Sequence, residues 1–351
     1  MQDRINWIDA VKGTCLFLVV IAHLWSPCPL WTHVLTGGYM QVFFVMAGIT
    51  SIRFIRSFRE QIISKCKRIL LPYAIYGITL LLLGVILPKH IEFGRGILGL
   101  LYGRYMLFPP SAEVNFPLLQ ACGYLSPFWF LPCIFFSYIL LAWYDHSKRP
   151  YLIVVLAICV SIASPLLPIL LPWSIEMAFI GFLLMIYGRG LHGILFDPPA
   201  QFNRHFHLFL LWIGSAIVYM IAWKIDGPVN MSLSVIGSES MFFPFRFIFF
   251  ILLGVSEALF LSLLFRALDT SVITRGLAYI GRHALRLLCI HLFIGESIFF
   301  LLADRDLPKI VSFMCALLVI FIIDYILEHY SLIIQSLFGQ KTSGDIPAKK
   351  H

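Results

Sequence analysis

The sequence predicts an all-α, polytopic membrane protein with about ten transmembrane helices, and three observations support this fold class. Of the 351 residues, 60% are hydrophobic and 13% are charged, whereas soluble domains contain about 25% charged residues. The mean hydropathy is +0.89. Apolar runs of roughly the 20 residues that a transmembrane helix needs recur along most of the chain. The net charge of +8 therefore reflects Lys and Arg in loops and predicts no binding of nucleic acid.

Two apolar stretches of the chain differ from a simple transmembrane helix. Residues 97–107 are too few to span a membrane and contain Arg104, so we expect an interfacial or re-entrant stretch. The fifth predicted segment contains Pro165 and Pro168, which predict a kink or a break in its helix. The ten predicted transmembrane segments are residues 8–25, 34–52, 69–87, 127–144, 151–171, 175–191, 206–223, 245–267, 285–303 and 310–329.

Lys and Arg gather in alternate connections, and cytoplasmic loops of membrane proteins collect these residues. Residues 53–68 contain six of them, whereas residues 26–33 contain none. The positive-inside rule therefore places both termini in the cytoplasm. Two long outer connections, residues 88–126 and 224–244, are placed to cover a substrate site that faces outward.

The sequence predicts one domain with no separate soluble part. We expect a transmembrane domain over residues 1–339 and a disordered cytoplasmic tail over residues 340–351. The cysteines form no CxxC pair and no His/Cys zinc spacing, so we predict no metal. The absence of Walker A, GxSxG, HExxH and dinucleotide-binding motifs argues against an ATP-driven pump and a soluble hydrolase.

The first apolar segment carries three ionisable residues on one face of its predicted helix. Asp9 lies three residues before Lys12, and His23 lies eleven residues after it. Helical geometry places Lys12 and His23 about 20° apart around the axis and ~16 Å apart along it. An anionic cytoplasmic cofactor would meet Lys12, and an outer substrate would meet His23, whose pKa suits a general base. The structural alternative is that all three residues simply lie at the membrane edges.

Other polar or aromatic residues of the predicted segments have a structural and a functional interpretation. Trp129 belongs either to an interfacial aromatic belt or to a substrate site. Glu176 is either solvated at the outer edge or faces a cavity. His291 either forms a hydrogen bond between helices or supports catalysis. Two further interior carboxylates, for which the sequence offers no partner, are Glu257 and Asp324.

Residues 4–13 (RINWIDAVKG) together with His23 resemble the opening motif of the membrane-bound acyltransferase-3 family. That motif has a basic residue, ten intervening residues and a His, with an Asp three positions before the basic residue. Lys12 stands where Arg is commoner, which replaces a bidentate cation with a point charge. Ala47, Ala284 and Leu288 also depart from the family pattern. Four later stretches resemble further family motifs in the same order, namely residues 43–48 (FFVMAG), 68–73 (RILLPY), 129–131 (WFL) and 281–291.

The resemblance implies a membrane O-acyltransferase that moves an acyl group, usually acetyl from acetyl-CoA, to a hydroxyl of an extracytoplasmic sugar, glycan or lipid-linked saccharide. Lys12 and Arg68 would hold or orient the acyl-CoA, and Asp9 would pair with Lys12. His23 would remove the proton of the attacking hydroxyl or carry the acyl group itself, and both routes stay open. The implied setting is a multi-pass protein of the cell membrane, in the simplest case the bacterial inner membrane.

Two rival functions remain. The first is a secondary transporter or exporter of a small polar or glycosylated solute, which the broken fifth helix and the buried Glu257 and Asp324 would suit. The absence of paired half-repeats disfavours it. The second is a receptor or assembly partner without turnover, which gives no reason for Asp9, Lys12 and His23 to share one face.

Overall fold

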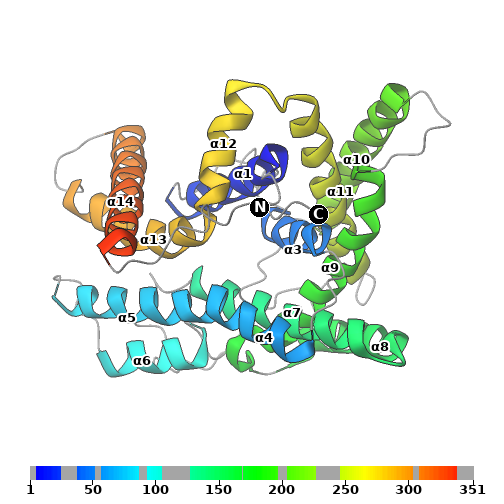
Figure 1. Ribbon diagram of the computed structural model, residues 1–351, viewed down its shortest axis with the longest axis horizontal. Helices are drawn as coiled ribbons and strands as arrows, with labels where there is room; N and C mark the ends of the chain where they lie inside the picture. Colours follow the sequence, from blue (N-terminus) through cyan, green and yellow to red (C-terminus); the bar gives the residue numbers. More distant parts are fainter. Residues whose placement is uncertain are drawn as a thin grey trace, which may run out of the picture. The chain divides into compact units, whose positions relative to one another are not determined.

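The computed structural model describes residues 5–24, 38–51, 57–86, 93–104, 127–167, 169–196, 204–226, 246–302 and 308–337, and all regular structure in these ranges is helical (Figure 1). The predicted all-α fold class is thus confirmed for the described residues. The helices are α1 (Asn6–Leu24), α3 (Tyr39–Thr50), α4 (Phe58–Lys65), η1 (Cys66–Leu70), α5 (Leu71–Ile86), α6 (Phe93–Tyr102), α7 (Phe130–His146), α8 (Pro150–Ala163), η3 (Ser164–Leu166), η4 (Pro172–Ser174), α9 (Ile175–Phe196), α10 (Arg204–Asp226), α11 (Arg246–Ala267), α12 (Val272–Arg282), α13 (Ala284–Leu302) and α14 (Lys309–Leu337).

Within the described residues, seven helices are long and apolar enough to cross a membrane, and the pair α12 and α13 makes an eighth candidate that is bent by 81°. Two shorter apolar helices, α3 and α8, have 12 and 14 residues. Their lengths correspond to roughly 20 Å, which is less than the hydrocarbon core of a bilayer. Each predicted segment thus contains a helix, and the chain is a multi-pass membrane protein, but the count of ten spans is not established.

The break after α8 and the short helix α6 were both expected from the sequence. Helix α8 ends at Ala163 and gives way to the 3-10 turn η3, which contains Pro165. The break predicted from the prolines is therefore present, although Pro168 lies outside the described residues. Helix α6 is too short to span, as expected for residues 97–107. Most of the two long outer connections and the tail of residues 340–351 also lie outside the described ranges.

The chain divides into two compact units, residues 1–292 and 293–351, with the boundary inside α13. In the first unit α1 packs along α12, α3 packs against α9, and α10 lies beside α11 (Figure 1). In the second unit α14 buries one face at four-residue intervals, formed by Ser312, Ala316, Ile320 and Asp324. This spacing is the one that keeps side chains on a single face of a helix.

Glycines bring two helix pairs of the first unit into backbone contact. A Cβ on Gly13 would overlap the carbonyl of Leu277 in α12, and a Cβ on Gly281 would overlap the carbonyl of Asp9 in α1. In the same way, Gly48 and Gly188 leave room for the backbones of α9 and α3. Small residues allow such close approach between membrane helices. The crossing of α1 and α12 thereby fixes the helix that carries Asp9.

A continuous helical rod runs through α4, η1 and α5 (Figure 1). It begins with a capping box in which the Ser57 hydroxyl accepts a hydrogen bond from the Glu60 N–H at 3.3 Å, and the Glu60 carboxylate accepts one from the Ser57 N–H at 3.1 Å. The middle of the rod, η1, is a π-helix of five residues. A π-helical turn widens the helix locally and often marks a functional site. Here it contains Arg68.

Candidate functional site

Helix α1 is continuous from Asn6 to Leu24, so Asp9, Lys12 and His23 lie on one rigid element. Asp9 lies in its first turn and His23 in its last, where the helix dipole favours an acid and a base, respectively. The Lys12 amine lies 3.7 Å from a carboxylate oxygen of Asp9. The predicted pairing of these two side chains is therefore present, while its role in acyl transfer stays a prediction.

Lys12 remains partly accessible in this pair. Its side chain is 28% exposed, whereas that of Asp9 is 10% exposed. A buried carboxylate thus holds the cation at the end of α1 that the charge distribution assigns to the cytoplasm. A loosely paired cation of this kind can release its partner for a stronger anion, such as a phosphate group.

The structure brings His23 together with His291, which the sequence did not pair. The two ring centroids are 5.4 Å apart, and the ring planes are inclined by 46°. His23 is exposed, whereas His291 is fully buried in α13. The two sequence-predicted histidines therefore form one centre at the end of α1 that is distant from Lys12.

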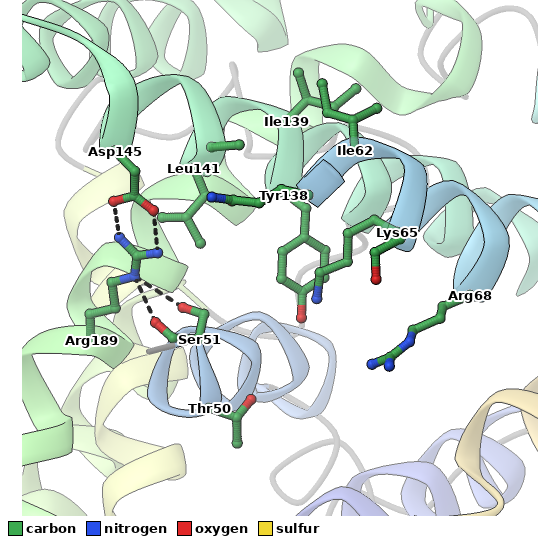
Figure 2. Close-up of a pocket in the computed structure, with 13 residues that line it drawn as sticks. Thr50, Ser51, Ile62, Lys65, Arg68, Tyr138, Ile139, Leu141, Asp145 and Arg189 are labelled. Carbon is green, nitrogen blue, oxygen red and sulfur yellow. Dashed lines mark hydrogen bonds and ion pairs between the residues drawn. The ribbon is translucent and has the colours of Figure 1, made fainter. Parts of the chain in front are cut away.

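Arg68 belongs to a different site, a pocket of about 330 Å³ between the end of α3, the rod of α4 and η1, and the second halves of α7 and α9. This volume is at the lower end of the range for small-molecule sites. Figure 2 shows Lys65 and Arg68 on one wall, with the Arg68 guanidinium extending toward the open space. We call this site the basic pocket; it is lined by Thr50, Ser51, Gln61, Ile62, Ser64, Lys65, Arg68, Tyr138, Ile139, Leu141, Ala142, Asp145 and Arg189.

Tyr138 forms the centre of the basic pocket. The Lys65 amine lies 3.4 Å from the centroid of the Tyr138 ring, a cation–π contact. Arg68 and Arg189 line the same pocket. Three cationic side chains, Lys65, Arg68 and Arg189, thus line one pocket, a chemistry that suits an anionic ligand.

An ion pair closes one side of the basic pocket. Arg189 donates two hydrogen bonds to Asp145, at 2.5 and 2.8 Å. Its Nε also donates to the carbonyl and the hydroxyl of Ser51, at 3.1 and 3.0 Å (Figure 2). These bonds tie α9 to α7 and α3, and they leave Lys65 and Arg68 as the cations on the opposite wall. Sequence reasoning missed Asp145 and Arg189, although opposite charges near the same ends of two apolar segments were a usable signal.

Glu176 forms an ion pair with Arg104 in which each side chain is 1% exposed. Arg104 also donates from Nε to the Leu171 carbonyl at 2.8 Å. The nearby Tyr102 hydroxyl donates to the Leu170 carbonyl at 2.7 Å, and burial raises the pKa of Tyr102. These bonds connect the end of α6 to the connection between α8 and α9. Glu176 is therefore not solvated at an outer edge, and its buried pairing favours a role in supporting the site over direct contact with a substrate.

Trp129 packs inside the protein. It is 6% exposed and meets Phe130 edge to face, with ring centroids 6.0 Å apart. Phe130 in turn contacts the rings of Phe43 and Phe44 in α3. A tryptophan of an interfacial belt exposes its ring to lipid headgroups, so the burial of Trp129 argues against the belt. Its part in a substrate site stays a prediction.

The predicted site residues therefore fall into five places rather than one. Asp9 pairs with Lys12, His23 with His291, and Glu176 with Arg104, while Arg68 and Trp129 lie in separate surroundings. In the described part of the chain no group of three or more His, Cys, Asp or Glu residues is arranged to hold a metal ion. The cations of the basic pocket and Lys12 suit an anionic ligand, and the imidazole of His23 suits base or nucleophile chemistry.

Comparison with known families gives one match. The model of the acyltransferase-3 family, described as an acyltransferase domain, matches residues 5–329. This range contains all five places described above. A comparison with curated proteins and a comparison with solved structures each find no match.

Proposed function

Because the chain belongs to the acyltransferase-3 family, we propose that this multi-pass membrane acyltransferase moves an acyl group, acetyl in the simplest case, from cytoplasmic acyl-CoA to a hydroxyl of an extracytoplasmic sugar, glycan or lipid-linked saccharide. The reaction is an O-acetylation that modifies an envelope polysaccharide or its precursor. The bacterial inner membrane supplies both compartments that this reaction needs. The charge distribution of the loops supports the assignment of the donor to the cytoplasmic side.

The observation that carries the proposal is the basic pocket. It lies at the ends of α3, α7 and α9 that precede the cation-rich connections, which the positive-inside rule assigns to the cytoplasm. Coenzyme A is polyanionic, and Lys65, Arg68 and the Tyr138 hydroxyl offer donors for phosphate oxygens. The pocket volume fits a part of the coenzyme, namely a phosphate group with its neighbouring atoms, rather than the whole molecule.

Helix α1 carries a candidate donor-binding residue at its cytoplasmic end and a candidate catalytic residue at its outer end. Lys12 lies near its cytoplasmic end and attracts or orients the anionic donor, with Asp9 fixing the position of the amine. His23 lies near the outer end, where a glycan hydroxyl arrives. The acyl group has to cover the distance between these ends, which is ~16 Å along the helix axis.

His23 supports two routes for the transfer itself. In the direct route His23 takes the proton of the acceptor hydroxyl while its oxygen attacks the thioester carbonyl. In the two-step route an imidazole nitrogen of His23 first attacks the thioester, and the acceptor hydroxyl then attacks the acyl-imidazole. Both routes end with an ester on the acceptor and a thiol on the coenzyme, and the geometry of α1 accommodates either.

Sealed membrane vesicles of defined orientation test this proposal. Radiolabelled acetyl-CoA does not cross a bilayer, so it reaches the basic pocket only where the cytoplasmic face is exposed. We expect inverted vesicles to incorporate label into glycan or lipid-linked saccharide, and sealed right-side-out vesicles to do so only after permeabilisation. Equal incorporation by both sealed preparations would contradict a cytoplasmic donor. Export of a solute without consumption of acyl-CoA would instead support the transporter.

A further inference from the structure

His291 holds one of its ring nitrogens against main-chain carbonyls. The Nδ1 atom lies 2.9 Å from the Leu288 carbonyl oxygen and 3.2 Å from that of Leu287. Because carbonyl oxygens only accept hydrogen bonds, Nδ1 must carry the hydrogen. A neutral imidazole has one N–H, so Nε2 presents a lone pair. The backbone of α13 thereby sets the tautomer of His291.

The Nε2 atom of His291 is a buried acceptor without a hydrogen-bond partner among the described residues. The side chain has no exposed area, so bulk water does not compensate for the missing bond. Leaving a buried polar atom unpaired is costly, and the few such atoms in a native protein call for an explanation. The neighbouring ring that can provide a donor is that of His23, 5.4 Å away between centroids.

His23 and His291 differ in what they can reach. His23 is exposed in the last turn of α1 and can meet a substrate, whereas His291 is enclosed. His291 therefore acts on the reaction through His23. The two rings share no hydrogen bond in this structure. The His23 side chain can rotate to form one because its exposed position leaves room, and catalytic hydrogen bonds commonly tighten only when substrate is bound.

We propose that His291 is a positioning residue whose Nε2 accepts the N–H of His23 and so directs the lone pair of the other His23 nitrogen toward the substrate. This inference rests on the proposed acyl transfer. It resembles the role of the carboxylate in a Ser-His-Asp triad, which orients the imidazole and stabilises its cationic form. His291 provides a neutral acceptor for the same purpose.

The proton and the electrons balance in this scheme. The acceptor O–H bond breaks, its proton moves to the free nitrogen of His23, and the hydroxyl oxygen forms a bond to the acyl carbon. The C–S bond of the thioester breaks, and its electron pair leaves with the sulfur as a thiolate. The His23 imidazolium, held by Nε2 of His291, then gives up its proton, and the thiolate acquires one. No oxidant, reductant or metal takes part.

Two substitutions of His291 in the full-length protein, reconstituted into lipid vesicles, test the proposal. Leu removes the acceptor, whereas the amide oxygen of Gln restores an acceptor close to the position of Nε2. We expect His291→Leu to lower kcat on the order of 100-fold with both KM values unchanged. We expect His291→Gln to stay within about tenfold of the wild-type kcat. His329→Leu, which removes an exposed histidine of α14, should leave kcat unchanged.

A merely structural role for His291 predicts a different result. Both variants would then yield less folded protein by size-exclusion chromatography, and the folded fraction of each would keep its kcat. That result overturns the proposal. Failure of His291→Gln to recover any of the activity lost in folded His291→Leu also overturns it.

A second measurement does not depend on acyl transfer. Diethyl pyrocarbonate modifies an imidazole nitrogen that has a free lone pair, and peptide mapping follows His23 alone. A hydrogen bond to His291 makes the other His23 nitrogen more basic. We expect His23 to react fast in the wild type and in His291→Gln, and to lose this fast reaction in His291→Leu. Equal rates in folded proteins overturn the pairing, whereas intact pairing without transfer from any acyl-CoA overturns the proposed function alone.

Discussion

Arg68 shows how a cation that the sequence places in a loop comes to line a pocket. The structure places it in the π-helix η1, on the wall of the basic pocket. Among the described residues it forms no hydrogen bond or ion pair, so its five N–H donors are available to a ligand. Arg189, by contrast, is committed to Asp145 and Ser51. We therefore propose Arg68 as the cation that binds the donor.

Replacing Arg68 should weaken donor binding and spare the chemical step. We expect Arg68→Ala to raise KM for acyl-CoA on the order of tenfold, because it removes hydrogen bonds to a charged group. The kcat should change little, since the phosphate groups lie far from the thioester. Arg59→Ala, which removes an exposed cation of α4 outside the pocket, is the matched control. Steady-state kinetics with varied acyl-CoA measure both values, and equal KM for the two variants would remove the role of Arg68.

The buried pair of Glu176 and Arg104 leads to a prediction about stability. Glu176→Gln leaves the Arg104 guanidinium buried without its carboxylate, which should cost about 3 kcal/mol of the free energy of unfolding. Replacing both residues with Met should recover part of this loss, because no unpaired charge remains. Thermal unfolding in detergent measures the three proteins. A normal unfolding midpoint for Glu176→Gln combined with a raised KM for the acceptor would assign Glu176 to the substrate site instead.

At the scale of helices, glycine contacts set the position of α1. The Gly13 and Gly281 positions allow the backbones of α1 and α12 to touch, next to the pair of Asp9 and Lys12. Helix α12 carries Arg275 and Arg282 and bends sharply into α13. A helix with these charges shows no apolar run, so the sequence predicted a single span that begins at residue 285. The amphipathic α12 was missed for that reason.

Two glycines of α12 provide a matched test of the helix crossing. Gly281→Ala forces a methyl group into the backbone of α1, and we expect a loss of about 1–3 kcal/mol of stability, the range for overpacking. Gly276→Ala meets no atom within 4 Å, so its gain in helix propensity should stabilise the protein by about 0.5–1 kcal/mol. Thermal unfolding distinguishes the two. Destabilisation of equal size by both substitutions would mean that the crossing is not tightly packed.

For the whole molecule, hydropathy and residue spacing predict the helices but not how they pack against one another. Hydropathy predicted a membrane protein and located a helix in every apolar segment, because burying backbone in a bilayer requires helices. Residue spacing predicted the pair of Asp9 and Lys12, since both lie on one helix. The contact of His23 with His291 joins residues 268 positions apart, and Arg189 with Asp145 joins different helices. Such contacts depend on helix packing, which a single sequence does not specify.

The orientation of the molecule can be tested with a native cysteine. Cys66 is exposed in η1, within the connection that the positive-inside rule assigns to the cytoplasm. We expect a membrane-impermeant maleimide to modify Cys66 in inverted vesicles and not in sealed right-side-out vesicles. The measurement uses a Cys28→Ser/Cys122→Ser background, because those residues are predicted on the opposite side, and peptide mapping identifies the modified residue. Modification from the outside would reverse the predicted topology and place the basic pocket away from acyl-CoA.

Acyl transfer centred on His23 is the central claim, and transfer of label from radioactive acetyl-CoA into envelope glycans or lipids tests it most directly. The comparison uses membranes that contain equal amounts of the folded wild-type protein or of His23→Ala. We expect labelled acceptor with the wild type and loss of the label with His23→Ala, because His23 is the exposed histidine that lies against His291 in the described part of the chain. Equal labelling by the two proteins would contradict the account and show that His23 is not the chemical centre.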